Sequence, residues 1–335
     1  MNGHVVLALE DKWIWDFWLA RKGREWHCYF LQADKTLGDP ELRHRNVTQG
    51  HAVSTDLISW EYRGTCFAPA PVPAWDDWTT WTGSVVKDGK GLWHLFYTGT
   101  QHERQGLHQR IGHATSKDMH SWKRVGNGLC LDLEGPLAQQ YEEYTPNHWP
   151  DRAMRDPWVM KDPDGNSWIM YFTARVPGRK EPNAGGAVGF ATSPDLKSWT
   201  LQKPVYEGGD FGQLEVPQVF KHGKHWYMTF CTAAEHWSEA YCAFNPQAPV
   251  TGNHYLMAES HLGPWTSPKP FLDGANPCRR YAGKIVEIER KLFLMAFLYY
   301  GEDGKFIGAL SDPVPVAVAD DGTLGIAETP AAPLT

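Results

Sequence analysis

The sequence lacks the features that mark membrane-spanning and nucleic-acid-binding proteins. No apolar run approaches the roughly 20 residues that a membrane span needs, and no long run of basic residues occurs. The 335 residues carry a formal net charge of -7, which disfavours a polyanionic partner. Residues 1–6 contain neither the basic start nor the apolar stretch of a secretory signal. We therefore expect a cytoplasmic protein with no nucleic-acid partner and no membrane partner.

The sequence also lacks the spacings of common metal, cofactor and disulfide sites. Its 15 histidines are dispersed without a paired spacing such as H-E-x-x-H, and neither a phosphate loop nor a dinucleotide fingerprint occurs. Segment 162–166 (DPDGN) is more typical of a hairpin turn than of a calcium loop. The six cysteines include no C-x-x-C pair, so we predict reduced thiols. We expect no cofactor and no bound metal.

The sequence does contain a repeat. A segment close to Gly-x-Ala-x-Ser-x-Asp-Leu-x-x-Trp occurs three times clearly and twice weakly, at 50–60, 112–122, 189–199, 255–265 and 308–312. Each copy follows an aromatic run with the length and composition of a buried strand, at 26–33, 93–100, 168–175, 226–233 and 293–300. Self-similarity of this kind predicts an architecture built from one recurring unit.

The recurring unit predicts an all-β protein. Around each aromatic run the order is strand, hairpin, strand, loop, strand, turn, strand. Four antiparallel strands repeated five times describe a five-bladed β-propeller. We expect the tail from Pro313 either to finish blade five or to pair with an N-terminal strand and close the ring. We predict one domain over residues 1–335, with blades at roughly 10–67, 80–131, 154–206, 213–272 and 281–328.

Three acidic residues stand at matching places in three of these units. Asp16 lies among aromatic residues on the first strand of blade one, and Asp156 and Glu215 open the first strands of blades three and four. The first strand of each blade lines the central channel, so we expect these carboxyls to meet at matched positions. Like charges push their pKa values apart, which leaves the ionised carboxylate and the protonated acid that glycoside hydrolysis needs. The alternative is that each acid is a structural residue at a strand end.

The segments around these acids carry a family resemblance. Segment 14–18 (IWDFW) is similar to the nucleophile segment of glycoside hydrolase family 68 and departs from the family 32 form, whereas 50–61 (GHAVSTDLISWE) resembles family 32. Segment 81–84 (WTGS) resembles a motif of both families, 155–157 matches their Arg-Asp-Pro, and 215–217 (EVP) stands where they have Glu-Cys-Pro or Glu-Arg-Pro. The chain therefore resembles glycoside hydrolase clan J, which includes invertases, levanases and levansucrases.

The resemblance implies an activity and a set of roles. It implies a retaining glycoside hydrolase that acts on β-fructofuranosides of the fructan, fructo-oligosaccharide or sucrose type, and that passes the fructosyl group to water or to a sugar acceptor. Asp16 would be the nucleophile, Glu215 the acid and base, and Asp156 the stabiliser of the transition state. Residues that we predict to bind substrate are Trp15, Trp18, Trp81, Ser84, Arg155, His51 and Glu235. Family 32 adds a C-terminal β-sandwich, for which we expect no room here.

Several alternatives stay open at this point. The activity could be that of an inverting furanosidase of the family 43 type, or the propeller could bind carbohydrate without catalysis. Trp18 and Trp81 could pack in the core instead of lining a sugar site. His51 could be a repeat residue, because His113 holds the same place in blade two. We expect the inserts 132–154 and 234–252 to shape the rim of the site.

Overall fold

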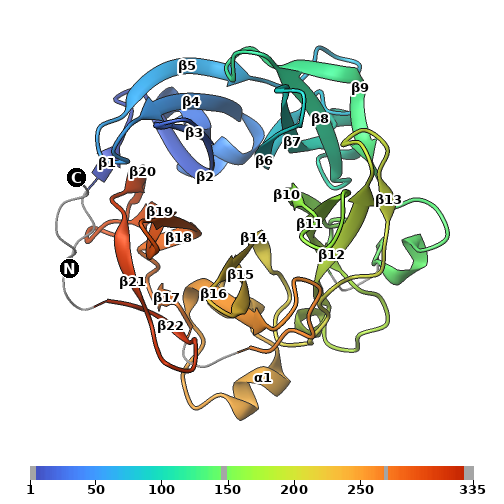
Figure 1. Cartoon of the computed structure of the whole chain (residues 1–335), viewed down its shortest axis with the longest axis vertical. Coiled ribbons are helices and arrows are strands. Elements are labelled where there is room, and N and C mark those ends of the chain that lie inside the picture. The colour runs from blue at the N-terminus through green and yellow to red at the C-terminus, as the bar shows by residue number, and fades with distance from the viewer. Residues whose placement is uncertain (1–4, 145–148, 268–270, 328–335) are drawn as a thin grey trace.

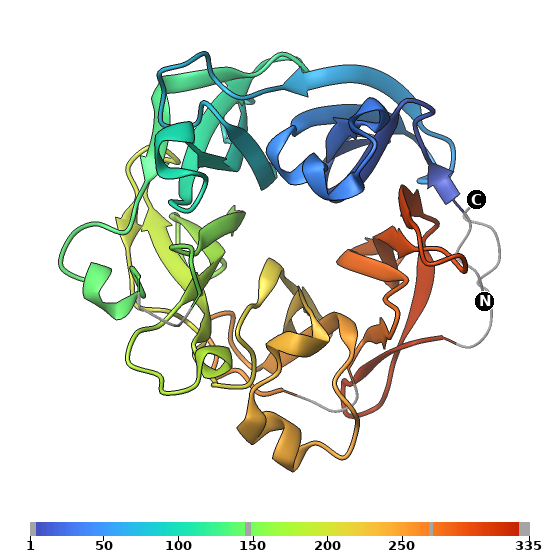
Figure 2. The ribbon, with the colours of Figure 1, turned by 180° about the vertical axis from the view of Figure 1, so that it is seen from behind.

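The chain forms five β-sheets arranged in a ring (Figure 1). The computed structural model describes residues 5–144, 149–267 and 271–327. The first strand of each of the first four sheets borders the centre of the ring, which Figure 2 shows from behind. The predicted five-bladed β-propeller is therefore confirmed. Residues 1–4, 145–148 of the insert predicted at 132–154, 268–270 of predicted blade four and 328–335 lie outside the described residues.

The first four blades follow one plan, with neighbouring strands antiparallel and paired in sequence order. Blade one contains β2 (Lys12–Lys22), β3 (Glu25–Asp34), β4 (Thr48–Ser54) and β5 (Glu61–Phe67). Blade two contains β6 (Thr79–Lys87), β7 (Trp93–Thr100), β8 (Arg110–Ser116) and β9 (Lys123–Leu131). Blade three contains β10 (Met154–Lys161), β11 (Trp168–Arg175), β12 (Gly186–Ser193) and β13 (Thr200–Leu201). Blade four contains β14 (Glu215–His222), β15 (His225–Thr232), β16 (Thr251–Ala258) and β17 (Asp273–Ala275).

Blade five joins both ends of the described chain. Its inner strands are β18 (Arg280–Ile288) and β19 (Lys291–Tyr300), and β19 pairs with both β20 (Phe306–Ser311) and β21 (Val314–Val318). The outer strand is in two pieces, because β1 (Val5–Leu7) pairs with β20 and β22 (Leu324–Ile326) pairs with β21. The tail after Pro313 thus finishes blade five, while the N-terminal strand β1 closes the ring.

The repeated Ser-x-Asp-Leu-x-x-Trp element is a tight turn. In blade one the Ser54 hydroxyl accepts a hydrogen bond from the amide of Leu57 (2.9 Å). Asp56 Oδ1 accepts from the amides two and three residues further on (2.8 and 2.7 Å). Side chains that bond nearby amides in this way replace the missing partners of a turn. They hold Leu57 at a φ of 63°, and Met119 and Leu196 adopt 67° and 65° in blades two and three.

The turns of blades two and four dock on the preceding blade. The hydroxyl of Tyr29 in blade one donates to the carbonyl of Met119 in the blade-two turn (2.7 Å), and Trp122 packs edge-on against the same tyrosine ring (5.7 Å). Tyr171 in blade three donates to the carbonyl of His261 in the blade-four turn (2.9 Å). The repeat therefore serves to join one blade to the next.

The repeated glycine has a packing reason. A Cβ on Gly112 would lie 2.2 Å from the ring of Tyr97, and a Cβ on Gly189 would lie 2.2 Å from the ring of Phe172. Both rings come from the neighbouring aromatic strand of the same blade. Only glycine leaves room for them. The aromatic strand thus supplies the ring, and the repeat supplies the glycine on which that ring packs.

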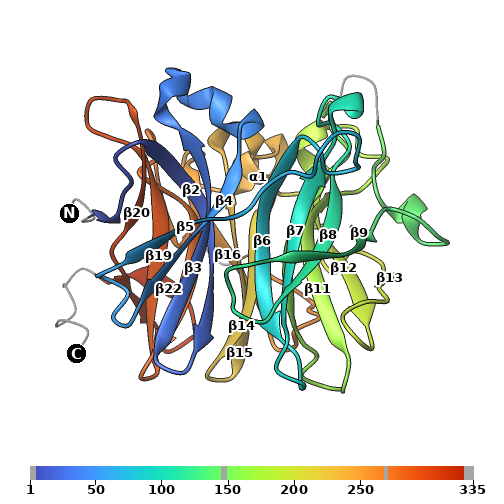
Figure 3. The ribbon, with the colours of Figure 1, turned by 90° about the horizontal axis from the view of Figure 1, so that it is seen from above.

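Short helices interrupt the strands. Figure 3 shows the blue segment that carries the first two of them, after β3, and the orange α1 at the same end of the ring. No helix among the described residues is long and apolar enough to cross a membrane. The helices are η1 (Lys35–Leu37), η2 (Pro40–Arg45), η3 (His102–Arg104), η4 (Ala138–Gln140), η5 (Pro182–Ala184), η6 (Ala234–His236) and α1 (Glu239–Phe244).

The packing of the repeat predicts the effect of a single methyl group. We expect Gly112→Ala to lower the free energy of unfolding by about 1–3 kcal/mol, because the added Cβ collides with a buried ring. Gly89→Ala is the matched control, since a Cβ at Gly89 meets no atom within 4 Å. Urea denaturation of both variants measures the difference. Equal stability of the two variants would contradict this account.

Candidate active site

The innermost strand of every blade has a break in its regular pairing, at an equivalent position in each blade. Its pairing with the second strand shifts register between residues 15 and 17, 81 and 83, 155 and 158, 215 and 218, and 281 and 284. A bulge of this kind leaves residues out of the ladder and re-aims their side chains. Five equivalent bulges therefore turn side chains from five blades toward one central space.

The residues just before the five bulges form what we call the upper ring. Its members are Trp15, Trp81, Arg155, Glu215 and Tyr281. Asp16 and Asp156 each follow one position later, inside the bulge. The expectation that three acids occupy matched positions is therefore wrong, because Glu215 lies one residue earlier than the other two. The sequence spacing did not reveal where each bulge begins.

The bulge residues of blades three and four have unusual backbone conformations. Asp156 adopts a φ of 57° and Val216 a φ of 53°. A positive φ is uncommon for residues other than glycine and is costly for a β-branched side chain such as valine. Strained backbone of this type gathers at functional sites, where the surrounding contacts hold it in place. Here the amide of Val216 donates to Asp156 Oδ2 (3.1 Å), which ties the two bulges together.

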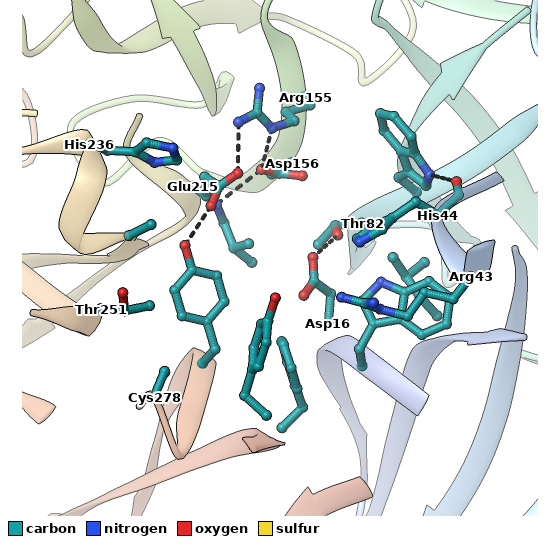
Figure 4. A pocket seen from close by; sticks show the side chains of 18 of the residues that line it. Asp16, Arg43, His44, Thr82, Arg155, Asp156, Glu215, His236, Thr251 and Cys278 are labelled. Carbon is teal, nitrogen blue, oxygen red and sulfur yellow. Dashed lines mark hydrogen bonds and ion pairs between the residues drawn. The ribbon is translucent and has the colours of Figure 1, made fainter. Parts of the chain in front are cut away.

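The upper ring and the bulges line a cavity of about 560 Å³ (Figure 4). This size falls within the range of roughly 300–1,000 Å³ that is usual for small-molecule sites. All three predicted catalytic acids line it. Inserts between strands complete the wall, with Arg43 and His44 from η2 and Glu235 and His236 from η6.

Asp16 is a part-buried carboxyl with one hydroxyl donor. Its Oδ2 accepts a hydrogen bond from the hydroxyl of Thr82 (2.7 Å), the bulge residue of blade two. Burial and the neighbouring Asp156 carboxyl raise the pKa of Asp16 to about 7, and Thr82 only partly opposes that rise. Asp16 is therefore neutral in most molecules of the free protein below pH 7.

Asp156 is buried and more fully bonded. Its Oδ2 accepts from the hydroxyl of Thr173 (3.0 Å) as well as from the amide of Val216, and its own amide donates to Thr98 (2.8 Å). Burial raises the pKa of Asp156 above its usual value, although the adjacent Arg155 opposes the rise. These bonds fix the orientation of the carboxyl beside the open part of the cavity.

Glu215 is held by two strong donors (Figure 4). Arg155 Nη2 donates to its Oε1 (2.9 Å), and the Tyr281 hydroxyl donates to its Oε2 (2.6 Å). Burial opposes ionisation of Glu215, but Arg155 and Tyr281 outweigh it, so the pKa of Glu215 lies below its usual value. Arg155 is itself fixed by Gln213 (2.8 Å) and Gln109 (3.3 Å).

The resulting protonation order differs from the expected one. Sequence analysis assigned the ionised carboxylate to Asp16 and the proton to Glu215. In the structure the pKa of Asp16 is raised and that of Glu215 is lowered. The reason is the two donors on Glu215, of which Tyr281 comes from a blade with no acid in the cluster. The opposite shifts of these two pKa values place a shared proton on Asp16 in preference to Glu215 in the free protein.

A comparison with known protein families identifies the family of the chain. The model of the glycosyl hydrolases family 32 N-terminal domain matches residues 18–262. The chain belongs to this family. The match includes the segments of β10 and β14 that carry Asp156 and Glu215.

Individual relatives agree with this family 32 membership, and a solved structure shares the fold. An invertase from Wickerhamomyces anomalus is 27% identical over 266 residues, which cover 77% of this chain and 44% of the relative. A levanase from Bacillus sp. (strain L7) is 29% identical over 201 residues, or 55% of this chain and 19% of the relative. The chain thus spans less than half the length of these relatives. The structure of an inulosucrase from Halalkalicoccus jeotgali bound to kestose shares the fold, with a TM-score of 0.79, 21% identity, and coverage of 100% and 93%.

Four of the residues predicted to bind substrate line the cavity of this family 32 chain. Trp15 and Trp81 belong to the upper ring and form an aromatic wall, and the indole of Trp81 is fixed by the carbonyl of His44 (2.9 Å). Arg155 lies beside Glu215, and Glu235 is exposed on η6 at the edge of the cavity. Flat aromatic faces with polar groups between them suit sugar rings.

Two other predicted residues lie one level below the cavity, in what we call the lower ring. Trp18 does not line the cavity but is fully buried and stacked on Tyr29 (6.1 Å). Ser84 is also buried, and its hydroxyl accepts from the amide of Val159 in blade three (3.0 Å). The prediction that these two residues bind sugar is wrong, because both follow the bulge, whereas the cavity is lined by the bulge residues and those just before them. The lower ring consists of Trp18, Ser84, Trp158, Gln218 and Lys284.

His51 is also absent from the cavity wall. Its ring lies between His27 (3.0 Å) and His120 (3.1 Å) and stacks on Tyr29 (4.8 Å). Burial lowers the pKa of His51 to about 3, so the ring is neutral. His113 hydrogen-bonds His94 in the same way in blade two (2.9 Å). His51 is therefore a repeat residue with a structural role. The predicted role of His51 in substrate binding is corrected to this structural one.

Sequence reasoning missed several residues of the wall. Tyr281 was only part of an expected inner strand, because nothing in its sequence marks it as a partner of Glu215. Arg43 was missed because it lies in an insert with no repeat pattern. It stacks on Phe306 (4.2 Å) and pairs with Glu41 (2.8 Å). Burial and the neighbouring Arg43 lower the pKa of His44 to about 4, so this imidazole is neutral.

The described residues form neither a metal-binding cluster nor a disulfide. No group of three or more His, Cys, Asp or Glu residues among them is arranged to hold a metal ion. Asp162 uses its Oδ1 and Oδ2 to bond Asp164 (3.0 Å) and Ser167 (2.7 Å), as a hairpin turn does. All six cysteines are unpaired.

The protonation order predicts the pH dependence of kcat/KM. The catalytic roles predicted from the sequence require one proton in the cluster, so we expect kcat/KM to fall as the pH rises through about 7, where Asp16 gives up a proton. It should also fall on the acid side, where Asp156 takes up a second proton at a raised pKa. Initial rates at low substrate across the pH range measure the profile. A value of kcat/KM that still rises above pH 7 would contradict the order.

Thr82→Val tests whether the fall of kcat/KM at alkaline pH, which we call the alkaline limb, is due to Asp16. The substitution keeps the shape of the side chain but removes the hydroxyl that donates to Asp16 Oδ2. Because that bond favours the ionised form, its loss should raise the pKa of Asp16 and move the alkaline limb to higher pH. Thr65→Val, whose hydroxyl bonds Gln32 in blade one (2.8 Å), should leave the limb in place. Identical limbs in the Thr82→Val variant and the wild type would overturn the assignment of the limb to Asp16.

Proposed function

We propose that the protein is a retaining β-fructofuranosidase that acts on fructans, fructo-oligosaccharides or sucrose-like substrates. The observation that carries the proposal is the convergence of Asp16, Asp156 and Glu215 on one cavity of sugar-binding size, between aromatic walls. Membership of family 32 supports it, and relatives with detectable sequence similarity are named invertase, levanase and sucrose-6-phosphate hydrolase.

The first step breaks the glycosidic bond. The Asp16 carboxylate attacks the anomeric carbon, and a covalent bond forms between Asp16 and the sugar as the bond to the leaving oxygen breaks. Glu215 gives its proton to that oxygen, so the leaving group departs as a neutral alcohol. The cluster must therefore hold its proton on Glu215 at this moment. Substrate binding selects the minor protonated form in which Asp16 is ionised.

The second step releases the sugar. Glu215, now ionised, takes a proton from a water molecule whose oxygen attacks the anomeric carbon, and the bond to Asp16 breaks. Asp16 leaves as a carboxylate and Glu215 is protonated again, so the site returns to its starting charge. A sugar hydroxyl in place of water would give fructosyl transfer by the same route. Glu235, exposed at the cavity edge, is positioned to contact such an acceptor.

Asp156 and Arg155 support both steps. Asp156 is held beside the cavity by Thr173 and Val216, where its carboxylate can accept hydrogen bonds from ring hydroxyls and stabilise positive charge at the anomeric carbon. Arg155 keeps Glu215 in one orientation through its bond to Oε1. The site thus separates attack, proton transfer and charge stabilisation among three acids from three blades.

A product assay tests the proposal directly. The panel should contain sucrose, inulin, levan, difructose anhydrides and arabinofuranosides, with NMR of the anomer that forms first. We expect cleavage of β-fructofuranosides and fructose released first in the β configuration. Release of the α anomer would indicate the inverting mechanism of the family 43 alternative. No turnover of any substrate, with sugar binding retained, would favour a carbohydrate-binding propeller.

Asp16→Asn separates turnover from folding. We expect kcat to fall by at least about 1,000-fold, because the amide cannot act as the nucleophile. The folded-state pKa of Asp16 lies above its unfolded value, so the ionisation of Asp16 destabilises the fold as the pH rises through about 7. Asp16→Asn removes that cost, so its Tm should exceed that of the wild type above pH 7. An unchanged kcat would remove Asp16 as the nucleophile.

Glu215→Ala tests the acid and base. We expect natural substrates with poor leaving groups to lose the most activity, because only they need a proton on the leaving oxygen. Azide should partly restore turnover of an activated fructoside, since it needs no general base to attack. Glu259→Ala, at an exposed residue of blade four, is the control. If activated and natural substrates lose activity equally, Glu215 does not have this role.

A further inference from the structure

Lys284 is a buried lysine under the acid cluster, with no role in the steps described above. It belongs to β18 and is the first residue after the blade-five bulge, with only 3% of its surface exposed. Its Nζ donates to the carbonyl of Val216 in blade four (2.8 Å) and lies over the ring of Trp158 (5.7 Å). A lysine is almost never this buried unless it is paired.

Lys284 breaks the pattern of the lower ring. Ser84 bonds Val159 in the following blade (3.0 Å), and Trp158 donates to the carbonyl of Val219 in the following blade (3.1 Å). Gln218 bonds both the amide and the carbonyl of Ile285 in blade five (2.7 and 2.9 Å). These three residues each join their blade to the next one around the ring.

Lys284 bonds in the opposite direction. The lower-ring pattern would join it to blade one, but its ammonium bonds the preceding blade at Val216, the residue that follows Glu215. The same Val216 donates its amide to Asp156 Oδ2. One residue at a φ of 53° is therefore held by Lys284 through its carbonyl and by Asp156 through its amide. A purely structural member of the ring would not need to reach the bulge of an acid-bearing strand.

The charge of Lys284 also faces the cluster. Burial lowers the pKa of Lys284 to about 8, and the nearby Asp156 and Asp16 oppose that fall. The titratable groups that face it come from β2, β10 and β15, namely Asp16, Asp156 and Cys231. Burial holds the pKa of Cys231 well above its usual value, so this thiol is neutral. Lys284 is thus a second cation of the cluster, which faces Asp16 and Asp156, while Arg155 lies beside Asp156 and Glu215.

We propose that Lys284 is a positioning residue of the catalytic site, which holds the Val216 bulge between Asp156 and Glu215 and presents a positive charge to Asp16 and Asp156 from below. This inference rests on the proposed function for its kinetic consequences. Lys284 does not reach the substrate, because it lies beneath the cavity wall. It acts through the two acids and the backbone that it holds.

Three substitutions separate the two contributions of Lys284. Lys284→Met removes both the charge and the hydrogen bond, Lys284→Gln keeps a donor without the charge, and Lys284→Arg keeps the charge. Lys221→Met, at an exposed lysine of β14, is the control and should match the wild type. Circular dichroism and Tm establish which variants fold.

We expect Lys284→Met to lower kcat by about 10- to 100-fold with a smaller change in KM, because displaced acids affect the transition state most. The alkaline limb of kcat/KM should move to higher pH by about one unit in Lys284→Met and Lys284→Gln, since Asp16 loses its nearby cation. Lys284→Arg should keep the limb near pH 7. A folded Lys284→Met variant with wild-type kcat and an unmoved limb overturns the inference.

An NMR titration makes the test independent of turnover. With ¹³C-labelled aspartate carboxyls, the Asp16 midpoint should lie near pH 7 in the wild type and higher in Lys284→Met. If the wild type cleaves no fructoside but this difference appears, the proposed function fails and the placement of Lys284 stands. If neither uncharged variant folds, the ¹⁵N signal of the Lys284 ammonium in the wild type decides. It should shift as Asp16 ionises near pH 7, and a constant signal there overturns the inference.

Discussion

The site depends on one backbone feature, the bulge that recurs on the innermost strand of every blade. A regular strand alternates its side chains, so an unbroken inner strand would offer the channel every second residue and nothing between. The bulge adds residues to the row that faces the cavity. It allows Glu215 and the backbone amide of Val216, which are adjacent in sequence, to serve the same site. Without this irregularity the propeller would still close, but Asp16, Asp156 and Glu215 would not share one cavity.

Electrostatics explains why the three carboxyls of the site have different neighbours and different pKa values. Three carboxyls in a buried space repel one another. Two cations, Lys284 beneath them and Arg155 beside them, reduce this repulsion. Arg155 and Tyr281 stabilise Glu215 as an anion, whereas the Asp16 carboxylate is favoured by the Thr82 hydroxyl and, more weakly, by Lys284. The free protein therefore favours the proton on Asp16 over Glu215. The raised pKa of Asp16 also means that the proposed nucleophile lowers stability when it ionises, which is the relation between activity and stability expected of a catalytic site.

The sequence predicted the fold well because the fold is repetitive. The Ser-x-Asp-Leu-x-x-Trp turn and the glycine that seats an aromatic ring are local devices, and local devices can be found in a single sequence. The same spacing could not show where a bulge begins, so Glu215 was placed level with Asp16, and Trp18 and Ser84 were placed in the cavity. Tyr281, Arg43 and Lys284 were missed for a different reason. Each acts on the site through contacts between distant parts of the chain, and no local pattern records such contacts.

In the proposed mechanism Asp16 attacks the sugar and Glu215 transfers the proton. The most direct measurement is the intact mass of the Glu215→Ala variant after incubation with β-fructofuranosyl fluoride, whose leaving group needs no acid. Without a base to activate water, the covalent intermediate should accumulate. The account predicts a mass increase of one fructosyl unit on the protein, mapped by peptide analysis to Asp16. Release of fluoride without any adduct, or an adduct on another residue, would contradict it.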